Sequence, residues 1–167
     1  MTALQITEIG SLMNQMLKGN MFDSFLLKEA SVTQAYETTI DGTVRESFYS
    51  AEEAERLGLT GFRYVPFSHV RPLCLNLLKG SRMPEAFRFV FLLSPQNQAG
   101  TISRSGTGFS TEDITGLFLN LIYRDNSLVC TTGISYRIFS MDKSLEAEWD
   151  RLVEVFFRQH GIAVDKL

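Results

Sequence analysis

Hydrophobic residues recur along this chain with two periods, one typical of strands and one typical of helices. Leu4 and Ile6 alternate with polar neighbours, which predicts a short strand at the start. Helical spacing follows in Ile9, Leu12, Met13, Met16 and Leu17. Thr7 is placed to cap this helix and Gly19 to end it, because glycine readily adopts the left-handed conformation found beyond helix ends. The first unit is therefore a strand followed by an amphipathic helix.

The next segment carries strand and turn signals. Residues 25 to 40 contain neither proline nor glycine and gather β-branched and aromatic side chains towards their end. Asp41-Gly42 follows as a two-residue hairpin signal, which predicts a return strand over Thr43 to Tyr49. Ser50 and Glu53 have capping-box spacing, so a short helix is expected to run to Leu57 and stop at Gly58.

A second apolar helix and a strongly patterned strand occupy the middle of the chain. Ser68 is placed to cap the helix, with Pro72 in its opening turn and Gly80 after its end. Phe87, Phe89, Phe91 and Leu93 share one face of the strand that follows. Ser94-Pro95 then has the pattern of a helix start, with serine as the cap and proline at the first helical position.

The last third predicts a hairpin and a long helix. Residues 117 to 124 and 127 to 140 are two strands joined at Asp125-Asn126, and Ser144 to His160 carry a buried stripe that includes Trp149. Strands and helices are interspersed without a regular βαβ rhythm. We therefore predict a single α+β domain over residues 1–167, with a mixed or antiparallel sheet covered by two or three helices.

Composition supports a globular chain. It is 44% hydrophobic and 21% charged, which is enough to build one core without a disulfide or a metal. No apolar run approaches the roughly 20 residues that span a bilayer, and the first residues carry no basic leader. A cytoplasmic location is the expectation. Cys74 and Cys130 lie in apolar patterns and are expected to be free thiols.

Charge is uneven along the chain. Residues 61–104 hold six basic side chains against Glu85 alone, although the whole chain has a net charge of -3. The candidate contacts for an anion or a nucleic acid are Arg71, Lys79, Arg82 and Arg88. Phe62, Tyr64 and Phe67 lie nearby in sequence, and aromatic and basic residues together suit a single strand. The alternative is that this basic segment neutralises the acidic flanks of its own fold.

Other chemistry is sparsely represented. Cys74 and His69 are the best candidates for a nucleophile and a base, because a helix start lowers a thiol's pKa. A buried structural cysteine explains the same residues. The cysteines and histidines lack zinc-site spacing, so neither a metal nor a cofactor is expected. The glycine-bearing loop over 104–111 lacks the lysine and spacing of a P-loop and is expected to be a flexible turn.

Several segments resemble an uncharacterised family of small proteins from anaerobic Gram-positive bacteria. They are Phe22-Asp23 with 25–27, Arg71-Pro72 through Lys79-Gly80, 116–120, 130–133 and 142–146. The resemblance implies a single cytosolic domain of unknown function and supplies no catalytic residues. A looser likeness is to the DNA sliding clamps, whose domains begin strand, helix, long strand and use hairpins similar to 127–133. The predicted C-terminal helix departs from that pattern.

These observations favour a non-catalytic cytosolic binding or assembly module. A nucleic-acid accessory protein, sliding-clamp-like and using the basic segment 61–104, is the alternative, and a small cysteine-dependent enzyme is a further one. The partner expected is a protein or a nucleic acid and not a membrane. A homodimer through an exposed strand edge is the expected assembly, because two-fold dimers are the commonest oligomers.

Overall fold

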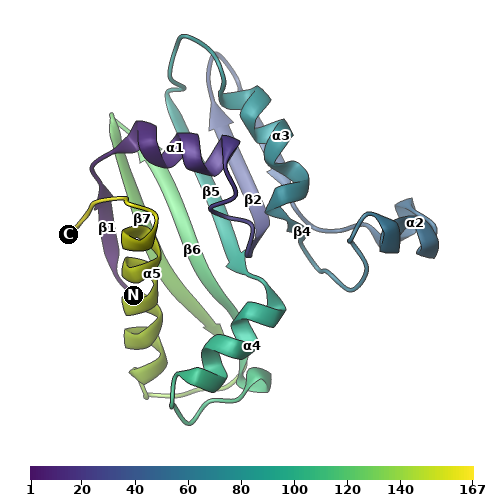
Figure 1. Ribbon diagram of the computed structural model, residues 1–167, viewed down its shortest axis with the longest axis vertical. Coiled ribbons are helices and arrows are strands. Elements are labelled where there is room, and N and C mark those ends of the chain that lie inside the picture. Colours follow the sequence, from purple (N-terminus) through teal and green to yellow (C-terminus); the bar gives the residue numbers. More distant parts are fainter.

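A single antiparallel sheet with helices across one face forms the body of the protein (Figure 1). The computed structural model describes residues 1–167. The strands are β1 (Ala3–Ile6), β2 (Phe25–Thr33), β3 (Glu37–Asp41), β4 (Val65–Pro66), β5 (Ala86–Leu93), β6 (Ile114–Arg124), β7 (Ser127–Tyr136) and β8 (Val164–Lys166). Their order is β3-β2-β5-β6-β7-β1-β8, and β4 also pairs with β2.

Five α-helices accompany the sheet. They are α1 (Ile9–Lys18), α2 (Ala51–Arg56), α3 (Phe67–Leu78), α4 (Pro95–Arg104) and α5 (Ser144–Gln159), with short 3-10 turns η1 (Glu46–Phe48) and η2 (Thr111–Asp113). Helices α1, α3 and α5 lie across one face, α4 lies at one end of the sheet, and α2 stands away from the body (Figure 1). The predicted α+β class, with an antiparallel sheet under helices, is confirmed. No helix has both the length and the apolar character needed to cross a membrane.

Side-chain alternation in the central strands explains why the helices gather on one face. Phe87, Phe89 and Phe91 of β5 are fully or almost fully buried, whereas Arg88 between them is exposed on the other face. The ring of Phe22, in the segment after α1, stacks on Phe91 with centroids 4.5 Å apart. The core therefore lies between the sheet and the helical layer, and the second face of the sheet has no helical cover.

The predicted hairpin turn and the predicted end of the last helix are confirmed, although the second hairpin strand ends at Tyr136 and not at Ser140. Asp125 and Asn126 connect β6 to β7 with φ values of 52° and 59°, the left-handed pair that a tight hairpin requires. Helix α5 ends before Gly161, whose φ is 69°. Strand β7 has ten residues against eleven in β6, and its other edge pairs with the four residues of β1.

The predicted hairpin turn at Asp41-Gly42 is wrong. Strand β3 already ends at Asp41, and the link between β2 and β3 lies at residues 34–36, where the Gln34 N–H donates to the Tyr36 carbonyl at 2.9 Å. Gly42 is needed for close approach: a Cβ there would lie 1.8 Å from the Leu27 carbonyl oxygen. The glycine lies against the edge of β2 where the arm begins, and not at a reversal of direction.

An insertion on the edge of β2 forms an arm, defined here as residues 43–64. Strands β3 and β4 both pair with β2, and the arm leaves the body between them (Figure 1). A hydrogen bond of 2.9 Å from the Val44 N–H to the Arg63 carbonyl closes its base. The Ser50 hydroxyl accepts from the Glu53 N–H at 3.2 Å, so the predicted cap of α2 is confirmed. The strand predicted over Thr43 to Tyr49 is not formed.

The middle helix begins earlier than expected. Helix α3 starts at Phe67, directly after the two β4 residues that pair with β2, and Pro72 lies in its second turn. The pairing of β4 with β2 fixes the position at which the helix begins. Capping residues in the sequence do not indicate this pairing. Strand β8, not predicted, adds to β1 at the far edge of the sheet.

Candidate functional site: a cationic groove on the open sheet face

A groove of about 560 Å³ lies between the base of the arm and α4. Its apolar floor belongs to the face of the sheet turned away from α1, α3 and α5. Leu26, Leu92 and Phe118 form that floor, and they are direct cross-strand neighbours on β2, β5 and β6. The volume is within the range of ligand sites in proteins.

Two β-bulges shape this groove. The pairing of β2 with β5 shifts register between Leu27 and Glu29, and the pairing of β6 with β7 shifts between Ile114 and Gly116. The residues inside the two shifts, Lys28 and Thr115, both line the groove. Bulges redirect side chains and are frequent beside functional sites. The two β-bulges of the sheet therefore both lie at this groove.

Gly116 makes room for the floor. A Cβ at this position would lie 2.4 Å from Cδ1 of Leu92 and 2.8 Å from the Phe118 ring. Because glycine carries no side chain, these two residues pack directly against the strand and leave the space above them open. The groove depends on this glycine for space and not for a special backbone angle.

Three cations line the groove and none of them is neutralised by a carboxylate. The Lys28 ammonium lies 5.5 Å from the centre of the Phe118 ring, and the Arg63 guanidinium lies 5.3 Å from the centre of the Tyr64 ring. Both distances suit a cation–π interaction. Arg137 donates to the Glu112 carbonyl at 3.3 Å. No ion pair involves any of the three, and no Asp or Glu lines the groove.

Hydroxyl groups complete the polar rim. The Thr115 hydroxyl lies 2.8 Å from the Ser135 hydroxyl and donates to the Ser135 carbonyl at 3.0 Å. Thr111 lies farther along the rim. These groups and the three cations are hydrogen-bond donors for an anion. The lining contains no His, Cys, Asp or Glu.

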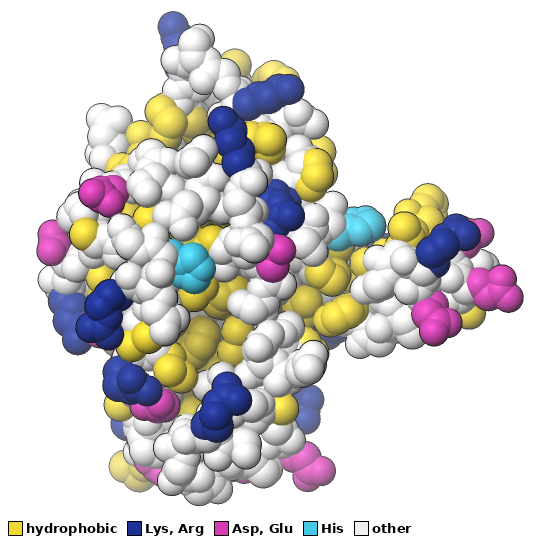
Figure 2. Space-filling view, in the orientation of Figure 1, with side chains coloured by type: hydrophobic (Ala, Val, Ile, Leu, Met, Phe, Trp, Pro, Cys, Tyr) yellow, Lys and Arg dark blue, Asp and Glu magenta, His cyan; other side chains and the backbone are white.

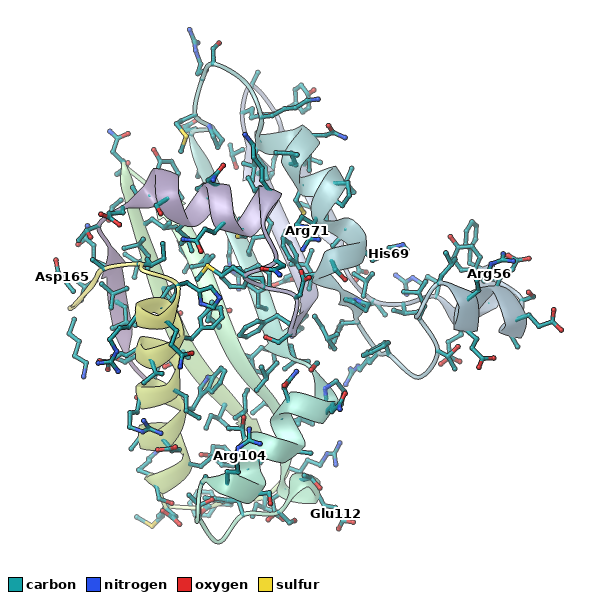
Figure 3. All side chains as sticks on the ribbon, viewed as in Figure 1. Arg56, His69, Arg71, Arg104, Glu112 and Asp165 are labelled. Atoms are coloured by element: carbon teal, nitrogen blue, oxygen red, sulfur yellow. The ribbon has the colours of Figure 1, made fainter.

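The sequence-predicted cations Arg71, Lys79, Arg82 and Arg88 are distributed over both sides of the sheet. Arg71 forms an ion pair with Asp23, and Figure 3 shows it on the side of α3 that faces α1. Arg88 lies on the open face and pairs with Glu29 at 3.3 Å. Lys79 and Arg82 are exposed at and beyond the end of α3. The structure brings Lys79 together with Lys18 on one shallow groove, and it separates both from Arg88.

The Cys74 and His69 pair does not form a reactive site. Cys74 is fully buried in the middle of α3, and burial raises the pKa of its thiol from 9.0 to about 12. The expectation that a helix start lowers this pKa is therefore wrong, because the helix begins seven residues before the cysteine. His69 is exposed and projects from the side of α3 nearer the arm (Figure 3). Burial also raises the pKa of the Cys130 thiol.

Two backbone amides at the start of the glycine-bearing loop after α4 are hydrogen-bonded within the chain. The Ser105 N–H donates to the Thr101 carbonyl at 3.0 Å, and the Thr107 N–H donates to the Ser105 hydroxyl at 3.3 Å. Gly106 has a φ of 68°, as expected for a helix end. No group of three or more His, Cys, Asp or Glu side chains is arranged to hold a metal ion.

Comparison with known proteins places this fold in a family. Residues 15–165 match a family of unknown function, DUF5721. The chain belongs to the DUF5721 family. The predicted membership of a family of unknown function is confirmed, and the predicted bacterial source stays a prediction. No curated protein and no solved structure matches this DUF5721 chain.

Sequence reasoning did not select the groove cations of this DUF5721 protein. Arg63 and Tyr64 lie in the basic segment and are adjacent in sequence. This adjacency of a cation and an aromatic residue was the one sequence feature that pointed to the groove. Lys28 and Arg137 come from segments 35 residues or more away from Arg63. Their convergence depends on strand order and on a bulge, and neither leaves a pattern in the sequence.

Proposed function

We propose that this protein is a non-catalytic cytoplasmic binding module that takes an anionic ligand in the groove. The observation that carries the proposal is that Lys28, Arg63 and Arg137 line one apolar-floored groove without a carboxylate. On the same sheet face, Arg88 is paired with Glu29. A ligand that supplies negative charge completes the groove.

The aromatic rings support this proposal. Phe118 and Tyr64 hold two of the cations in position, which reduces the side-chain entropy lost when an anion binds. The floor of Leu26, Leu92 and Phe118 favours a ligand with an apolar part next to its anionic group. Hydroxyls of Thr115 and Ser135 provide further hydrogen bonds.

Calorimetric titration of inorganic pyrophosphate and of citrate into the protein at low and high salt tests the proposal. Binding is expected at low salt and should weaken as salt screens the cations. Lys28→Met combined with Arg63→Gln should lower affinity by about tenfold or more, because each lost charge-assisted hydrogen bond contributes about 1.5–3 kcal/mol.

Arg88→Gln is the matched control. It removes one arginine from the same sheet face, but that arginine is already paired with Glu29. Its affinity for pyrophosphate should remain close to that of the unsubstituted protein. Equal losses in the two variants, or no binding of either probe at low salt, would contradict the proposed function.

A nucleic-acid accessory role is the second candidate, and it uses Arg71, Lys79, Arg82 and Arg88. Its support is the shallow groove shared by Lys18 and Lys79, because neither these lysines nor Arg82 forms an ion pair. Fluorescence anisotropy with labelled single-stranded DNA at two salt concentrations tests it. Lys79→Ala with Arg82→Ala should lower the affinity, whereas Lys28→Met with Arg63→Gln should leave it unchanged. No binding at low salt removes this candidate.

A further inference from the structure

The outer part of the arm, residues 46–56, is acidic and exposes aromatic and apolar side chains. Its carboxylates are Glu46, Glu52, Glu53 and Glu55, and none of them forms an ion pair. Figure 2 shows acidic side chains at its free end, well away from the body. Phe48 is 78% exposed, and its ring lies against that of Tyr49, at 4.9 Å between centroids. Such a surface lacks a partner within its own chain.

The arm and the groove have complementary chemistry. The groove offers three cations without a carboxylate and an apolar floor. Residues 46–56 of the arm offer four carboxylates against one cation, Arg56, and an exposed aromatic ring. Both unpaired sets lie on the same chain. We propose that the arm of one copy docks in the groove of a second copy, and that the second copy returns the contact.

The position of the arm supports a reciprocal contact. Gly61, Arg63 and Tyr64 belong both to the base of the arm and to the rim of the groove. Helix α2 extends away from the body and so does not cover the groove of its own chain (Figure 1). A two-fold axis beside this rim places each arm over the other copy's groove, which is the closed symmetry of a dimer.

The edge strands of the sheet are less suitable surfaces for dimer formation than the arm. Edge strand β3 carries Glu37 and Asp41 on its exposed positions, and edge strand β8 carries Asp165 and Lys166. Charged residues on edge strands oppose pairing with another sheet.

The reciprocal arm contact rests on the proposed function, because it identifies the anionic ligand as the arm of a second copy.

Sedimentation velocity of the full chain over a range of protein concentrations, at low and high salt, tests the dimer. The unsubstituted chain should approach twice the monomer mass at low salt and dissociate at high salt. An arm-reversed variant, Glu52→Lys with Glu53→Lys, and a groove-reversed variant, Lys28→Glu with Arg63→Glu, should each be monomeric. These sites are exposed or half-buried, and circular dichroism checks that each variant is folded.

Mixing the two reversed variants provides the decisive measurement. The basic arm of one then meets the acidic groove of the other, and the original arm and groove meet in the second contact, so a heterodimer should form. Monomeric unsubstituted protein at low salt, a dimer that both reversals leave intact, or no heterodimer in the mixture would each overturn the arm contact.

Failure of this inference and failure of the proposed function have different signatures. The variant Glu52→Gln with Glu53→Gln leaves the groove intact and is expected to be monomeric. If it binds pyrophosphate while the unsubstituted chain never dimerises, the groove binds an anion other than the arm. If it binds neither pyrophosphate nor citrate and the unsubstituted chain is monomeric at low salt, both proposals fail.

Discussion

The indole nitrogen of Trp149 donates a hydrogen bond of 2.9 Å to the carbonyl oxygen of Phe118. Trp149 lies on the buried side of α5, and the Phe118 ring forms part of the groove floor on the other face of the sheet. One bond therefore connects the helical layer to the strand that carries the groove. The helices act on the groove by holding β6 in place, although they do not line it.

Trp149→Phe should lower the free energy of unfolding by about 1–3 kcal/mol, because it removes the indole donor from a partly buried carbonyl. Urea unfolding followed by circular dichroism measures the change. Phe156→Leu, at a partly buried site on the same helix, is a control for loss of aromatic packing without loss of a hydrogen bond. An unchanged unfolding midpoint in Trp149→Phe would show that this bond contributes little.

Gly42→Ala should prevent normal folding or destabilise the protein strongly. Its added Cβ would lie 1.8 Å from the Leu27 carbonyl oxygen and 3.0 Å from that of Lys28, where the arm leaves the edge of β2. Gly10→Ala is the matched control, because no atom lies within 4 Å of its added Cβ. Within α1 that substitution should stabilise the chain by roughly 0.5–1 kcal/mol. Thermal unfolding of the two variants should shift in opposite directions.

The buried Cys74 thiol predicts a loss of stability at alkaline pH. Its folded pKa is raised from 9.0 to about 12, so the stabilisation is fully present below pH 9.0 and is lost as pH rises toward 12. In that window the unfolded thiol releases a proton that the folded thiol keeps. At about pH 10.5 the contribution of Cys74 amounts to a loss of about 2 kcal/mol.

Cys74→Ala removes this contribution. Urea unfolding of both proteins at neutral pH and at pH near 10.5 should show a smaller alkaline decrease in the variant, whatever its stability at neutral pH. Parallel decreases would mean that the folded thiol ionises as readily as the unfolded one. The difference in slope isolates Cys74 from Cys130, whose burial acts in the same direction.

Thr132→Val should cost about 1–3 kcal/mol, because the hydroxyl of Thr132 is buried and carries two hydrogen bonds. It donates to the Asp150 carboxylate on α5 and accepts from the Thr2 N–H at 2.9 Å. Thr131→Val is the control on the opposite face, where the hydroxyl accepts one bond of 3.2 Å from Asn120 at a half-exposed position. Equal losses measured by urea unfolding would contradict a special role for the buried hydroxyl.

Local patterns in the sequence predict much of this fold correctly. The left-handed pair Asp125-Asn126, the cap at Ser50 and the stripe of α5 each depend on residues within a few positions of one another. Such signals act through local backbone preference and periodic burial, and both can be recognised without the rest of the chain. The hairpin assigned to Asp41-Gly42 failed because the same glycine serves a distant contact with Leu27.

The sequence alone determined the α+β class, the amphipathic helices near the two ends of the chain, the last hairpin and the basic character of residues 61–104. Each of these depends on residues that are neighbours in the sequence. Only the tertiary structure decided which cations share a groove. Lys28, Arg63 and Arg137 meet through strand order and a bulge, and Arg88 is separated from Lys79 by the alternation of β5. Those relationships arise from the pairing of strands that are far apart in the sequence. The conformational preference of an individual residue does not specify which strand its own strand will pair with.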